Sequence, residues 1–135
     1  MGLTAGHTRA HVIRAILEGV AFSLRDTVEI FKEMNVPVGE IRLGGGGARS
    51  ELWRQVQADV YGCKVNTVEA EEGAAYGAAL LAGVGAGSWH SVDEACDSVV
   101  RIKSAVAPNP EAVAALEPQY RRFRAVYPAL RPLYE

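Results

Sequence analysis

The sequence has little excess charge of either sign, few cysteines and no long apolar run, and each shortage excludes a class of protein. Fourteen basic residues stand against 16 acidic ones, for a formal net charge of −2. This balance favours neither nucleic acid nor an anionic membrane surface as a partner. Cys63 and Cys96 lack metal-ligand spacing, so we expect buried reduced thiols, no metal site and a cytoplasmic protein. We expect no membrane partner either, because no apolar run reaches membrane-spanning length.

What remains is typical of one globular domain. The chain has 135 residues, of which 49% are hydrophobic and 22% charged. That length is enough to bury a single core, so we expect residues 1–135 to form a single domain.

Four consecutive glycines, Gly44 to Gly47, form the most informative stretch. They follow an expected strand over Glu40–Leu43 and precede an expected helix from Ser50 to Tyr61, with Gly62 as its terminating residue. Glycines before a helix start let a ligand approach backbone N–H groups that have no partner within the helix. This order favours an anion site, most often for phosphate. A plain strand-to-helix turn with surplus glycine is the simpler alternative.

The common nucleotide motifs do not fit these glycines. The last glycine of a dinucleotide fingerprint would fall on Arg49, and no Gly-Lys-Ser/Thr follows the turn. An acidic residue about 20 positions further on, after a proper strand, is also missing. These absences argue against a Rossmann-type dinucleotide binder, which we keep as an alternative.

The elements on either side of this stretch are also predictable. Apolar residues at spacings of three and four predict a long helix from Arg9 to Met34, with Thr8 as N-cap and Asn35 at its end. Its apolar surface is wide, so we expect other elements to cover this helix on more than one side. Lys64 to Val68 reads as a second strand, which would pair parallel with the first through a right-handed crossover.

In the stretch from Glu71 to Gly83, two acidic residues, Glu71 and Glu72, precede an expected helix made almost entirely of small residues. Its low bulk suits either a close ligand or tight packing on the sheet. Further on, Ser91 to Glu94 fits a capping box for a helix to about Val100. The stretch from Arg101 to Ala107 looks extended or irregular. A helix starting at Asn109 should be interrupted by Pro118.

Three segments, His7 to Asp26, Gly45 to Asp59 and Glu72 to Gly83, resemble the FGGY carbohydrate kinases and occur in that family's order. Within the family they are most similar to members that phosphorylate xylulose. The resemblance implies an α/β fold: part of a ribonuclease-H-like lobe of the actin-like ATPase superfamily, with a short parallel sheet packed with helices. Residues 1–135 would be the C-terminal nucleotide-binding lobe fragment of a sugar kinase.

The same resemblance implies which residues meet the nucleotide. The three glycines Gly45, Gly46 and Gly47 would approach adenosine and phosphates through their backbone. Ser50 stands where some relatives have Asn near the adenine. The full implied set of nucleotide-binding residues is Gly45, Gly46, Gly47, Arg49, Ser50, Gly73, Ala74 and Tyr76. No catalytic residue and no metal ligand is expected within this chain.

The implied activity is transfer of the ATP γ-phosphoryl group to a sugar hydroxyl, for xylulose its 5-hydroxyl, with Mg²⁺ carried by the nucleotide. The aspartate base and the sugar contacts would belong to a first lobe, so this chain alone should be inactive. Adenine nucleotide is then its direct partner. We also expect a homo-oligomer, because the strand at Glu40–Leu43 would have a bare edge. The alternative function is a non-catalytic scaffold or assembly module that retains the kinase-lobe fold.

Overall fold

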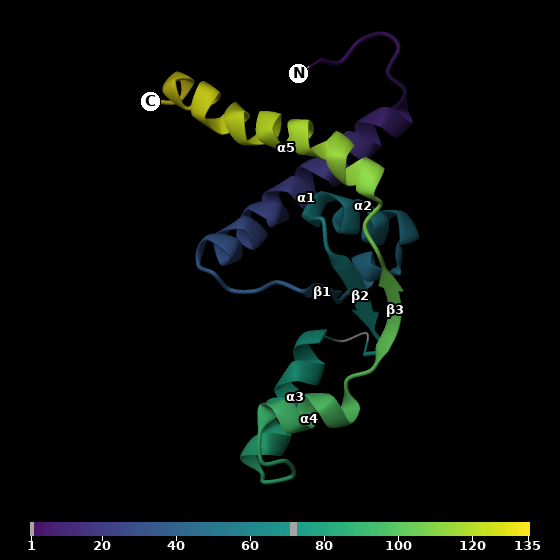
Figure 1. The fold of residues 1–135 in the computed structure, drawn as a ribbon, viewed down its shortest axis with the longest axis vertical. Coiled ribbons are helices and arrows are strands. Elements are labelled where there is room, and N and C mark those ends of the chain that lie inside the picture. Colours follow the sequence, from purple (N-terminus) through teal and green to yellow (C-terminus); the bar gives the residue numbers. More distant parts are fainter. Residues whose placement is uncertain (1, 71–72) are drawn as a thin grey trace.

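The computed structural model describes residues 2–70 and 73–135, which form a small mixed sheet with helices around it (Figure 1). The helices are α1 (Arg9–Glu33), α2 (Glu51–Tyr61), α3 (Gly73–Gly85), α4 (Val92–Val99) and α5 (Pro110–Leu130). The strands are β1 (Glu40–Leu43), β2 (Lys64–Val68) and β3 (Ile102–Val106). Short 3₁₀ turns cover Gly46–Arg49 and Arg131–Leu133. In the described part of the chain, no helix is both long and apolar enough to cross a bilayer.

Local capping residues set the ends of α1, as the sequence predicts. Thr8 is the N-cap, and its backbone N–H donates to His11 Nδ1 at 3.1 Å. His11 therefore makes a local hydrogen bond at the helix start. Asn35 lies just past the helix with a φ of 57°, in the left-handed region that asparagine tolerates.

The sheet has the strand order β1-β2-β3. β1 and β2 pair in parallel, with Glu40 opposite Lys64 and Leu43 opposite Thr67, which confirms the predicted parallel pairing. β3 pairs antiparallel with β2, so the sheet is mixed. The stretch expected to be extended or irregular is therefore a strand. Among the described residues, the other edge of β1 has no neighbouring strand.

The hydrophobic core lies where α1, α2 and α5 meet one face of the sheet. Its fully buried side chains include Val56 and Val60 from α2 and Val65 from β2. The Phe22 ring of α1 contacts the Tyr120 ring of α5 at 5.7 Å between centroids. The Tyr120 hydroxyl donates to Asp26 at 2.5 Å, so a polar contact also joins α5 to α1.

The prediction that Pro118 interrupts the last helix is wrong, because α5 runs unbroken from Pro110 to Leu130. A proline inside a helix removes one backbone hydrogen bond and costs roughly 3 kcal/mol. On either side of it, Leu116 and Tyr120 are 7% and 4% exposed, in the core. Burying a large apolar side chain stabilises a fold by about 1.5–3 kcal/mol. The burial of these two side chains therefore offsets the free-energy cost of the proline.

α3 and α4 pack chiefly on each other and lie apart from the other helices in Figure 1. The small residues of α3 therefore do not serve tight packing on the sheet. A Cβ added at Gly83 would lie 2.4 Å from Cζ3 of Trp89, so that glycine makes room for the indole ring. The acidic residues expected before this helix, Glu71 and Glu72, lie outside the described residues.

The predicted capping box before α4 forms only in part. Ser91 Oγ accepts from the Glu94 N–H at 3.1 Å, as expected. The Glu94 carboxylate accepts from the His90 N–H at 2.7 Å, one residue earlier than the motif requires. The two contacts still occupy donors at the start of the helix.

An apolar groove of about 660 Å³ separates α1 from the open edge of β1. Leu24 and Phe31 line it from α1, and Ile41 and Leu43 line it from β1. On the strand, Glu40 and Arg42 alternate with these apolar residues and are exposed. Their side chains form an ion pair, with Arg42 Nε 3.2 Å from Glu40 Oε1. The unpaired edge therefore combines an apolar face with one cation and one anion.

Candidate functional site

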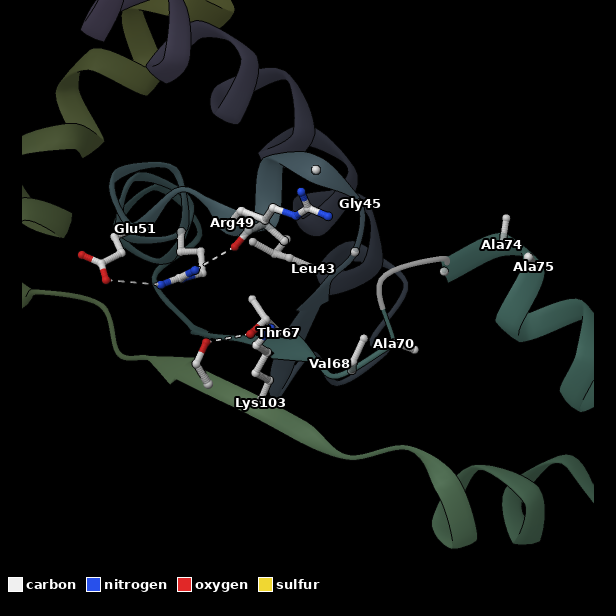
Figure 2. Close-up of a pocket in the computed structure, with 16 residues that line it drawn as sticks. Leu43, Gly45, Arg49, Glu51, Thr67, Val68, Ala70, Ala74, Ala75 and Lys103 are labelled. Atoms are coloured by element: carbon white, nitrogen blue, oxygen red, sulfur yellow. Dashed lines mark hydrogen bonds and ion pairs between the residues drawn. The ribbon is translucent and has the colours of Figure 1, made fainter.

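A pocket of about 820 Å³ opens at the carboxyl ends of β1 and β2 (Figure 2). Its walls come from the β1–α2 connection, the end of β2, the start of α3 and the start of β3. Ligands of open α/β sheets bind outside the carboxyl ends of the parallel strands. The volume also lies within the roughly 300–1,000 Å³ typical of small-molecule sites.

The glycine turn forms one wall of this pocket. Gly45 has φ 75° and ψ −179°, a combination that is almost restricted to glycine. Gly46 begins a 3₁₀ turn that ends at Arg49, so α2 starts after this turn and not directly after the glycines. A Cβ added at Gly46 would meet no atom of the described residues within 4 Å. The backbone at Gly46 therefore faces open space.

Gly47 and Ser50 serve the fold at this turn. A Cβ at Gly47 would lie 3.3 Å from two ring atoms of Trp53, so glycine there allows the indole to pack against the turn. Ser50 Oγ accepts from the Trp53 N–H at 3.3 Å and caps α2, as the sequence predicts. Gly62 ends the helix with a φ of 65°.

Cationic side chains surround the pocket. Among the described lining residues, Arg49, Arg54 and Lys103 are cationic and Glu51 is acidic. One guanidinium N–H of Arg54 donates to the Ala48 carbonyl at 2.8 Å, which ties α2 to the glycine turn. Arg54 Nε is buried and has no hydrogen-bond partner among the residues that the structure describes. This lining suits an anionic ligand.

The structure brings five of the eight predicted residues to the pocket: Gly45, Gly46, Arg49, Gly73 and Ala74. Gly47, Ser50 and Tyr76 do not line it. The Tyr76 hydroxyl donates to the Val99 carbonyl at 3.1 Å, and so holds α3 to α4.

Sequence reasoning did not find the β3 side of the pocket. Lys103 and Ser104 line it, and Ser104 Oγ lies 2.6 Å from Thr67 Oγ1 on β2. The apolar and polar residues of Ile102–Val106 alternate only weakly, and the pairing with β2 spans some 37 positions. In the described residues, no three His, Cys, Asp or Glu side chains gather where they would hold a metal ion.

Residues 1–86 match the family model described as "FGGY family of carbohydrate kinases, C-terminal domain". The xylulose kinase of Bacillus subtilis (strain 168) is 35% identical over 127 residues, which cover 94% of this chain and 26% of the relative. The crystal structure of xylulose kinase from Rhodospirillum rubrum superposes with a TM-score of 0.85 at 32% identity. The match covers 99% of this chain and 27% of the R. rubrum chain.

A glycerol kinase of Plasmodium falciparum, solved with ADP, superposes with a TM-score of 0.74 at 25% identity. This match covers 90% of this chain and 25% of the glycerol kinase chain. The chain thus spans about a quarter of the length of these relatives. The neighbours have the actin-like ATPase fold that the resemblance implies. From the family model and the shared fold together, this chain belongs to the FGGY family of carbohydrate kinases and matches its C-terminal domain.

Proposed function

We propose that residues 1–135 are the C-terminal nucleotide-binding lobe of a carbohydrate kinase, which transfers the γ-phosphoryl group of ATP to a sugar hydroxyl. The observation that carries this proposal is the open space over Gly46, in a pocket with cationic walls at the strand ends. Membership of a kinase family supports a nucleotide as the ligand class of that pocket. The scaffold alternative is not favoured, because the relatives named above are kinases.

In this proposal the nucleotide lies between the glycine turn and the start of α3. Gly45 and Gly46 let it approach the backbone, and Gly73 and Ala74 form the facing wall. Phosphoryl transfer depends mainly on positioning and on neutralising charge. Mg²⁺ would arrive with the phosphates and supply part of that neutralisation. Arg49 would add positive charge on the protein side.

For the acceptor we propose D-xylulose, giving D-xylulose 5-phosphate. The support is the pair of xylulose kinases at 35% and 32% identity. Since the chain spans about a quarter of these relatives, the base and the sugar contacts would come from the remaining part of the enzyme. The chain alone would then have no kinase activity.

A chimera tests the proposal directly. In the B. subtilis xylulose kinase, the matching segment is replaced by this chain, and xylulose-dependent ADP release is measured beside release with glycerol. We expect xylulose-dependent release from the chimera and none from the 135-residue chain alone. ATP binding to the isolated chain is measured by calorimetry in parallel. An inactive chimera together with a chain that binds no ATP would contradict the nucleotide-lobe assignment.

A further inference from the structure

β3 departs from regular antiparallel pairing at a single residue. Thr67 of β2 pairs with Ser104, and the next residue, Val68, pairs with Ile102. Lys103 is therefore the extra residue of a β-bulge. Bulges change the direction of a side chain and occur often at sheet edges and beside active sites.

The bulge brings Lys103 to the pocket. In a regular strand, neighbouring side chains point to opposite faces of the sheet, so Lys103 and Ser104 would face different ways. Here both residues line the pocket. Figure 2 shows Lys103 extending from β3 toward Thr67, on a different wall from Arg49. The pocket thus receives a cation from a strand as well as from the turn.

The Lys103 ammonium is available to a ligand. Within the part of the chain that the structure describes, it makes no hydrogen bond or ion pair. Arg54, by contrast, is engaged with the Ala48 carbonyl, and Arg49 also has an interaction within the protein. The strand beneath Lys103 is fixed by the 2.6 Å contact of Ser104 with Thr67. An ammonium on a fixed strand suits a phosphate oxygen, since charge-assisted hydrogen bonds are the strong ones.

We propose that Lys103 is a further nucleotide-binding residue, whose ammonium contacts the phosphate chain of the bound nucleotide; this rests on the proposed function. Lys103 lies beyond residues 1–86, the part matched by the family model. The simpler role for a lysine on an edge strand is to discourage pairing with another chain. That role requires neither the bulge nor a place on the pocket wall.

The test compares three ligands on the full 135-residue chain by titration calorimetry: ATP, ADP and adenosine. For Lys103→Met we expect ATP and ADP to bind about tenfold more weakly, with adenosine unchanged, because only the phosphates lose a charged partner. Lys103→Arg should keep the affinity for ATP within a few fold. Lys64→Met is the matched control, since Lys64 is 52% exposed on β2 and does not line the pocket.

Each outcome decides between the two proposals. If the wild-type chain binds ATP and Lys103→Met binds it equally well, the inference about Lys103 is overturned and the proposed function stands. An equal loss for adenosine and ATP would also overturn it, because it would indicate a change in pocket shape. If the wild-type chain binds none of the three ligands, the proposed function fails and Lys103 has no nucleotide to contact. Circular dichroism checks that each variant is folded. If Lys103→Met does not fold, Lys103→Gln is used in its place.

Discussion

Three of the four glycines in the turn, Gly45, Gly46 and Gly47, should respond differently to an added side chain, and the structure indicates how. Gly46→Val is the main perturbation. A Cβ at Gly46 meets no atom within 4 Å in the part of the chain that the structure describes, and Gly46 does not have a positive φ. We expect its free energy of unfolding to change by less than about 1 kcal/mol, partly because valine restricts the unfolded chain more than glycine does. If a nucleotide contacts the Gly46 backbone, its atoms would lie closer to the new Cβ than the roughly 3.5 Å that two non-bonded carbons need, and binding would weaken.

The other two positions serve as controls. Gly45→Ala should cost about 1–3 kcal/mol of stability, because φ 75° with ψ −179° is a strained combination for alanine. Gly47→Ala should destabilise by about 1 kcal/mol or more, since its Cβ would press on Trp53 at 3.3 Å. Gly47 does not line the pocket, so ATP affinity should be nearly unchanged among the molecules that remain folded.

Two measurements separate these effects. Urea unfolding followed by circular dichroism gives the stability of each variant, and calorimetry gives its affinity for ATP. We expect Gly46→Val alone to combine a normal unfolding curve with at least a tenfold loss of ATP affinity. Normal stability with unchanged ATP affinity in this variant would refute the assignment of the glycine turn to the nucleotide.

Three further predictions concern the rest of the fold. Burial raises the pKa of Tyr61 from 10.0 to about 12. As the pH rises, the unfolded chain therefore loses the Tyr61 proton before the folded chain does. The free energy of unfolding should fall by up to about 3 kcal/mol between pH 10 and 12. Tyr61→Phe should remove this part of the loss in alkaline urea titrations, and an unchanged pH dependence would contradict it. Gly83→Ala should destabilise by about 1–3 kcal/mol, because its Cβ meets Trp89. Gly77→Ala should stabilise by about 1 kcal/mol, because no described atom lies within 4 Å of its Cβ. Equal shifts in melting temperature for the two variants would be inconsistent with this packing. The open β1 edge and its apolar groove should make the chain a homodimer or larger at micromolar concentration, and a 14.5 kDa monomer in light scattering would show that the edge is covered.

Features fixed by short-range chemistry could be predicted from the sequence. Thr8, Ser50 and Gly62 set helix ends through their own side chain or backbone freedom, and each lies where the sequence predicts. The parallel pair of β1 and β2 followed from a strand, a helix and a strand in close succession. These elements need no information from distant parts of the chain.

Features that depend on distant contacts could not be predicted in this way. Pro118 stays within α5 because residues on both sides of it are buried against other elements. β3 exists because β2 offers it an edge, and the bulge at Lys103 is a property of that pairing. For the site, the resemblance indicated the glycine turn and the start of α3, but it could not separate pocket residues from Ser50 and Tyr76, which make structural hydrogen bonds.

The central claim is that the pocket at the strand ends binds ATP, and amide chemical shifts measured during an ATP titration test it most directly. We predict saturable shifts at Gly45, Gly46, Gly73 and Ala74, with smaller ones at Lys103, and none along the apolar groove between α1 and β1. Shifts confined to that groove, or no saturable shift at the glycine turn, would contradict the account.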